Sequence, residues 1–125
     1  MPDQVVLDRI RTALDSGDVG SFAVLLTPDV TWGAPGSNNP PCKSDRDVVR
    51  WYQRGFDRGV RGRVFEVSSF GDNVLVGMMV TGNPGAEIGG QVERWQVLAL
   101  SEGLAKDIRG YEDRASAIVA AERAS

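Results

Sequence analysis

The fold of this chain is decided by its last third, which reads Gly90-Gln-Val-Glu-Arg-Trp-Gln-Val-Leu-Ala-Leu-Ser-Glu-Gly-Leu-Ala-Lys-Asp-Ile-Arg-Gly-Tyr-Glu-Asp113. Two segments rich in apolar residues flank Ser101-Glu-Gly103, which is a tight-turn sequence. This pattern predicts two antiparallel strands joined by a short turn. The alanine-rich segment from about 114 to 123 then predicts a helix, with Asp113 in front of it as a cap.

Two polar residues interrupt the first of these strands. Because strand side chains alternate between faces, Arg94 and Gln96 share one face with Val92 and Leu98. A polar group on a buried face costs free energy unless it has a partner. One interpretation is a polar anchor for the carbonyl or carboxylate of a ligand in an otherwise apolar pocket. The other is a buried ion pair of Arg94 with a carboxylate of the neighbouring strand, with Gln96 bonded to backbone. For that pair the candidates are Asp107 and Glu112.

Composition limits the class of protein. The chain has 125 residues, 42% hydrophobic and 25% charged, which predicts one domain spanning 1–125 with a continuous core. The net charge is −3 and the basic residues are dispersed, so we expect no nucleic-acid partner. No apolar run approaches the roughly 20 residues that span a bilayer, so we expect no membrane partner. A single cysteine, Cys42, and an N-terminus without secretory features predict a cytoplasmic protein.

The absence of histidine excludes several kinds of catalysis. Ser-His-Asp and Cys-His triads cannot form, and neither can histidine-based zinc or iron sites. We therefore expect no metal and no cofactor. Acid–base chemistry near neutral pH would have to use a perturbed carboxylate, a tyrosine, a lysine or Cys42.

The remaining pattern predicts two helices, a strand, a helix and then four strands before the final helix. The second helix carries Phe22, Leu25 and Leu26 and ends at Thr27-Pro28-Asp29, where a strand from Val30 follows. The third helix starts after Ser44. Residues 63–70 and 73–81 are predicted to form a hairpin, and 82–90, rich in Gly and Pro, a loop. The strand at 73–81 is apolar on both faces, so the sheet is expected to be covered on two sides. This order predicts an α+β fold.

This order resembles the nuclear-transport-factor-2-like, or cystatin-like, superfamily and its SnoaL-like group. The likeness rests on Leu25-Leu-Thr-Pro-Asp-Val-Thr-Trp32 and on Asp107-Ile-Arg-Gly-Tyr-Glu-Asp-Arg-Ala115. The resemblance implies a cone-shaped, curved antiparallel sheet around a pocket, closed by N-terminal helices and a C-terminal helix. It also implies a homodimer through the outer sheet face, which would cover the second apolar face of 73–81.

The resemblance includes limonene-epoxide-hydrolase-type sites, where an Arg-x-Asp and a second Asp on the last strand activate water. Alignment on Tyr111-Glu-Asp113 places Arg94 at the arginine, Gln96 at the first aspartate and Gly110 at the second. An amide cannot take up a proton from water at neutral pH. Epoxide hydrolysis is therefore disfavoured for this chain.

The predicted function is that of a SnoaL-like pocket protein that binds a small, hydrophobic, oxygenated molecule, such as a polyketide- or steroid-like compound. In the enzymatic version it is an isomerase or cyclase, in which Arg94 stabilises an enolate oxygen and Asp107 moves the proton. Gln96 and large apolar residues would line the pocket, namely Trp32, Trp51, Tyr52, Phe56 and Met78. The alternative is a non-catalytic binding or interaction module whose cavity is filled by these same side chains.

Overall fold

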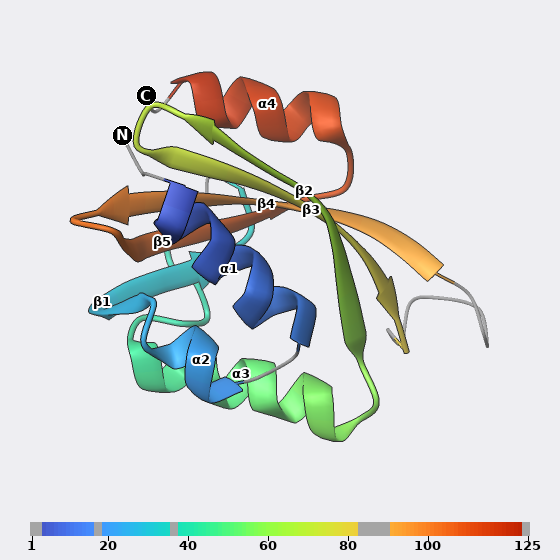
Figure 1. The fold of residues 1–125 in the computed structure, drawn as a ribbon. Helices are drawn as coiled ribbons and strands as arrows, with labels where there is room; N and C mark the ends of the chain where they lie inside the picture. Colours follow the sequence, from blue (N-terminus) through green and yellow to red (C-terminus); the bar gives the residue numbers. More distant parts are fainter. Residues whose placement is uncertain (1–3, 17–18, 36–37, 83–90, 124–125) are drawn as a thin grey trace.

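The computed structural model describes residues 4–16, 19–35, 38–82 and 91–123 and shows an α+β architecture (Figure 1). The predicted loop at 82–90 lies outside the described residues except for Gly82. The elements are α1 (Gln4–Ser16), α2 (Val19–Ala23), β1 (Leu26–Gly33), α3 (Asp45–Asp57), β2 (Arg61–Phe70), β3 (Asn73–Thr81), β4 (Gln91–Ser101), β5 (Leu104–Tyr111) and α4 (Arg114–Arg123). No described helix has the length and apolar character needed to cross a membrane.

The five strands form one curved sheet in the order β1-β5-β4-β3-β2. The strands from β2 to β5 pair antiparallel, as predicted, but β1 pairs parallel with β5. The sheet is therefore mixed, whereas the family resemblance implied an antiparallel one. The parallel pair arises because α3 and three strands separate β1 from β5, which gives the long crossover that parallel neighbours require.

The prediction for the start of β1 was wrong. Leu26 was expected on the second helix, yet α2 ends at Ala23 and β1 already begins at Leu26. β1 therefore contains Pro28, which has no N–H to donate to a neighbouring strand. A strand at the edge of the sheet tolerates a proline because its outer side needs no partner.

Strand β3 is buried on both faces, as its sequence predicted. Val74 and Val76 pack into the main core with α1, α2 and α3, whereas Leu75 packs against α4 with Trp95. Figure 1 shows α4 on one side of the sheet and the three other helices on the opposite side. Helix α4 thus covers part of the outer face that was expected to be covered by a second subunit.

Helix α3 begins where the sequence predicted. The Ser44 hydroxyl accepts a hydrogen bond from the Asp47 amide at 3.2 Å, which satisfies one of the free N–H groups of the first turn. The helix has Asp45 and Asp47 in its first turn and Arg54 in its last, an arrangement that complements the helix dipole. These features fix the register of α3 and therefore the positions of its aromatic residues.

Helix α4 is fastened to the sheet near both ends. At its start, the Arg114 guanidinium donates two hydrogen bonds of 3.0 Å to the Glu66 carboxylate of β2. Near its end, the Asn73 amide donates to the Ala121 carbonyl at 2.9 Å, and Asn73 is only 3% exposed. Because α4 is short, these contacts determine how it lies on the outer face.

Substitution of Asn73 by alanine tests the contact near the end of α4. We expect Asn73→Ala to lower the free energy of unfolding by about 1–3 kcal/mol, because the Ala121 carbonyl loses its buried donor. Asn39 is exposed, so Asn39→Ala should change stability by less than about 0.5 kcal/mol. Urea denaturation of both variants gives the comparison, and equal small effects would contradict a structural role for Asn73.

The ion pair at the start of α4 predicts a pH dependence. The Arg114 hydrogen bonds hold the pKa of Glu66 below its ordinary value of 4.5. A lowered carboxyl pKa adds stability that is present above the unfolded pKa and is lost as the pH falls through the folded one. Since Arg114 is half exposed, we expect Glu66→Gln to cost about 0.5–1 kcal/mol at pH 7, and the difference from wild type to shrink below pH 4.5.

Urea denaturation at pH 7 and at lower pH measures this difference. Glu102→Gln serves as the control for a surface carboxylate, because residue 102 lies exposed in the turn between β4 and β5. A Glu66→Gln effect of the same size at every pH would show that charge is not the cause.

Candidate functional site

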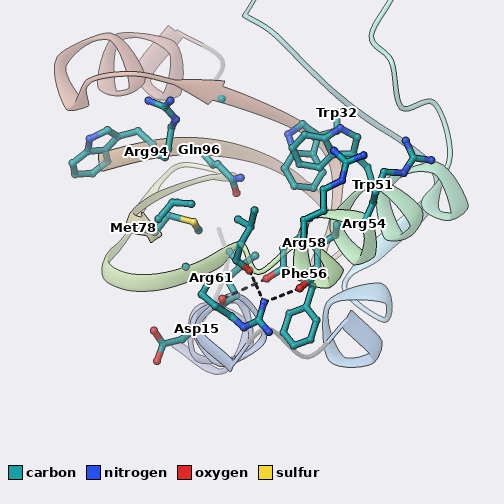
Figure 2. Close-up of a pocket in the computed structure, with 18 of the residues that line it drawn as sticks. Asp15, Trp32, Trp51, Arg54, Phe56, Arg58, Arg61, Met78, Arg94 and Gln96 are labelled. Carbon is teal, nitrogen blue, oxygen red and sulfur yellow. Dashed lines mark hydrogen bonds between the residues drawn. The ribbon is translucent and has the colours of Figure 1, made fainter. Parts of the chain in front are cut away.

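A cavity of about 610 Å³ opens between α3 and the inner face of β3 and β4 (Figure 2). Seven of the eight residues predicted for the site line it. In Figure 2, Met78 and Gln96 lie on one side of the cavity and Trp51 lies on the other. The seven residues are Trp32, Trp51, Tyr52, Phe56, Met78, Arg94 and Gln96.

The aromatic side of the cavity is built from β1 and α3. The rings of Trp32 and Trp51 lie 4.9 Å apart, and Trp51 is 53% exposed. Tyr52 packs at 5.0 Å from the buried ring of Phe22, and burial raises the pKa of its hydroxyl. Tyr52 therefore stays protonated at neutral pH. It can donate a hydrogen bond or add apolar surface, but it is a poor base.

Gln96 is the polar residue on the sheet side of the cavity. It pairs across the sheet with Val76 of β3 and with Gly110 of β5. Its amide oxygen is buried and has no hydrogen-bond donor among the described residues. Such an atom carries a desolvation cost of about 1–3 kcal/mol, which a hydrogen-bond donor on a ligand would offset.

Arg94 lies two residues before Gln96 on β4, opposite Met78. Its one hydrogen bond among the described residues is a long contact of 3.5 Å with the Glu93 carbonyl. The structure thus shows no ion pair of Arg94 with Asp107 or Glu112, which was the alternative interpretation of the sequence. The guanidinium group remains available to a ligand.

Asp107 is the predicted site residue that the structure does not bring to the cavity. Its carboxylate accepts hydrogen bonds from the Thr31 hydroxyl and from Arg109, with an ion-pair distance of 3.0 Å to Arg109. Thr31 and Asp107 pair on the face opposite Trp32 and Ile108. Asp107 and Arg94 therefore lie on different faces of the sheet, and the geometry does not support a proton transfer between them over one substrate.

Sequence reasoning missed several charged residues of the cavity. Arg54 of α3 and Arg58, the C-cap residue of that helix, line it, and so does Arg61 at the start of β2. The spacing of four residues between Arg54 and Arg58 was a signal that these two side chains lie on the same side of the helix end. The two carboxylates of the lining, Asp15 and Glu112, were also not assigned to it.

Arg61 and Asp15 have structural partners. The Arg61 guanidinium lies 3.6 Å from the centre of the Phe56 ring and donates to the carbonyls of Phe56 and Val60 (Figure 2). The Asp15 carboxylate accepts a hydrogen bond of 2.8 Å from the Val64 amide. Both residues therefore connect elements at the edge of the cavity.

The remaining reactive groups give little support to nucleophilic or metal chemistry. Cys42 is buried in the core, and burial raises the pKa of its thiol, which disfavours the nucleophilic thiolate. Within the described ranges, no group of three or more His, Cys, Asp or Glu side chains is arranged to hold a metal ion. The described cavity offers apolar contact, hydrogen bonds and positive charge.

Comparison with known proteins supports the fold. No family model matches the chain, and no curated protein matches it significantly. Among solved structures, a proposed polyketide cyclase from Sinorhizobium meliloti is 17% identical, with 89% of this chain and 95% of that one covered and a TM-score of 0.66. A proposed ketosteroid isomerase from Kribbella flavida is 16% identical, with 89% and 77% covered and a TM-score of 0.70.

A third structure, an epoxide hydrolase from M. tuberculosis described as similar to limonene epoxide hydrolase, is 18% identical, with 95% and 88% covered and a TM-score of 0.62. The chain therefore has the nuclear-transport-factor-2-like, or cystatin-like, fold, as its sequence predicted, because solved structures described in those two terms match it with TM-scores of 0.63 and 0.73. The names of these three proteins describe different reactions, so the fold by itself does not select one.

Gly110 lines the cavity and tests whether it is open, and Gly77, which is not part of the lining, is the comparison. A Cβ atom on Gly77 would lie 2.5 Å from the Trp95 ring, whereas one on Gly110 would meet nothing within 4 Å. We expect Gly77→Ala to destabilise the protein by about 1–3 kcal/mol through overpacking. Gly110→Ala should be neutral or stabilising, by up to about 1 kcal/mol, because it adds no clash and restricts the unfolded chain.

Thermal or urea denaturation of the two variants is the measurement. The pair is matched because both glycines lie in strands of the same sheet and have negative φ values. A strongly destabilised Gly110→Ala would mean that the space beside Gln96 is filled.

Proposed function

We propose that this protein binds a small, hydrophobic, oxygenated molecule in the cavity between α3 and the sheet. The buried Gln96 oxygen without a donor is the observation that carries the proposal. It lies in a cavity of about 610 Å³, within the range of sites for small molecules. A hydroxyl group of a ligand would supply the missing hydrogen bond, and the aromatic residues would contact its apolar body. Polyketide- and steroid-like compounds have this combination of groups.

The structural neighbours support the enzymatic version of this proposal, an isomerase or cyclase. In this version Arg94 would stabilise an enolate oxygen, which is supported by its place in the lining and by its lack of an ion pair among the described residues. The proton carrier, however, is better sought among the carboxylates that line the cavity, Asp15 and Glu112, than at Asp107. Asp15 already receives one backbone hydrogen bond, which fixes its position beside the cavity.

The cavity offers poor support for epoxide hydrolysis. Gln96 and Gly110 lie directly opposite one another on β4 and β5, at the positions where the resemblance would require two aspartates. Neither side chain can remove a proton from water. The register of the sheet thus supports the alignment from which the sequence prediction was made.

The alternative from a different class is an interaction module with a cavity filled by its own side chains. The open volume and the empty space beside Gly110 weigh against it. The proposed homodimer and the proposed cytoplasmic location are retained as expectations. Because α4 covers the outer face around Leu75, a partner subunit would contact the part near Phe65, which is 45% exposed.

A stability measurement tests the role of Gln96 before any ligand is known. We expect Gln96→Leu to raise the free energy of unfolding by about 1–2 kcal/mol, because it replaces a buried unpartnered oxygen by apolar atoms of similar volume. Gln53 lies on α3 outside the cavity, and Gln53→Leu should change stability by less than about 0.5 kcal/mol. A destabilised Gln96→Leu variant would show that Gln96 serves the fold.

Binding is tested with testosterone, a rigid steroid that carries a hydroxyl group, and with a polycyclic hydrocarbon of similar size. Native mass spectrometry and calorimetric titration should show tighter binding of the steroid to the wild type. Gln96→Leu should remove that preference while the hydrocarbon still binds. Failure of both compounds to bind to the wild type would contradict the proposed pocket for hydrophobic molecules.

A further inference from the structure

The lining of the cavity carries more positive than negative charge, although the chain as a whole carries −3. Four arginines and two carboxylates line the cavity, which gives the lining a net charge of +2. Arg61 is held by the Phe56 ring, as described above. Arg54, Arg58 and Arg94 have no ion pair with any described residue.

A purely structural role accounts for only part of this arrangement. Arg54 and Arg58 lie at the C-terminal end of α3, where positive charge is stabilised by about 0.3–1 kcal/mol by the helix dipole. Their spacing of four residues costs about 0.2–0.5 kcal/mol through repulsion of like charges. The helix end therefore tolerates both arginines, but it does not explain why both side chains line the cavity rather than pairing with acidic neighbours.

The location of the two arginines relates them to the apolar interior. In Figure 2, Arg54 and Arg58 extend along the side of the cavity that Trp51 forms, while Met78 and Gln96 lie across from them. A molecule that fills the cavity and reaches Gln96 at one end would have its other end beside these guanidinium groups. The guanidinium group is planar and binds a carboxylate or a phosphate through two parallel hydrogen bonds.

We propose that the ligand is an amphipathic anion, whose apolar body occupies the cavity and whose carboxylate or phosphate group is bound by Arg54 and Arg58. This inference rests on the proposed function, because it specifies the class of molecule that the same cavity binds. Both arginines are exposed, so the interaction with the anion is screened by salt.

The test compares four probes with apolar chains of nearly the same length: dodecanoate, dodecyl phosphate, dodecanol and dodecyltrimethylammonium. Calorimetric titration at low ionic strength should show dodecanoate or dodecyl phosphate bound at least tenfold more tightly than dodecanol, and the cation most weakly. Raising the salt concentration should remove most of this preference. The two anionic probes distinguish a carboxylate ligand from a phosphate ligand.

Variants of α3 connect the preference to particular residues. Arg54→Gln and Arg58→Gln should each weaken binding of the preferred anion about tenfold and leave dodecanol unchanged. Arg50 is the matched control: it lies one turn earlier on the same helix, is exposed and does not line the cavity. Arg50→Gln should leave binding of all four probes unchanged.

The outcomes separate this inference from the proposed function. If dodecanol binds as tightly as the anions, or if all three arginine variants behave alike, the anion inference is overturned and the apolar pocket remains supported. If no probe binds to the wild type, both proposals fail together. Circular dichroism of each variant checks that the substitution has left α3 folded.

Discussion

The burial of β3 on both faces is the constraint on which the rest of the structure depends. A strand that is apolar on both sides must have helices on both sides, because neither face can be left to water. Helices α1 to α3 cover the inner face, and α4 covers the outer one. The main core and the smaller cluster under α4 meet at this strand, so a change in β3 affects both layers at once.

The cavity follows from the way the inner face is covered. The sheet curves over α3, and a bulge between Val64 and Glu66 shifts the pairing of β2 with β3. Small residues then line the space between them, since Gly55, Gly62 and Gly110 all contribute to the cavity. Where β3 meets α1 and α2 the interior is filled by Val74 and its neighbours, and the open volume lies toward the other end of the strand.

The fold was largely predictable because its signals are local. Turn residues and alternating patterns located β2, β3, β4 and β5 closely, and the Ser44 cap located α3. The start of β1 was not predictable from these signals, because an edge position removes the usual penalty for Pro28 and only the assembled sheet shows which strand is at the edge.

Only some residues of the site could be predicted, because the signals for the others are not local. Arg94 and Gln96 were identified because they interrupt an apolar face, which is a property of a single strand. The position of Asp107 depends on the alternation around Ile108, which turns inward and leaves Asp107 and Arg109 together on the outer face. The arginines of α3 were overlooked because charged residues on a helix normally face water, and their relation to the cavity is a tertiary property.

The three tryptophans of the chain divide between the two sides of the sheet, with a practical consequence. Trp32 and Trp51 lie together at the cavity, whereas Trp95 is buried on the outer face near Phe65. The emission of an indole ring depends on the polarity of its surroundings. Replacement of Trp95 by phenylalanine would therefore leave a protein whose intrinsic fluorescence comes from the cavity alone, so that occupancy could be followed optically without any attached dye.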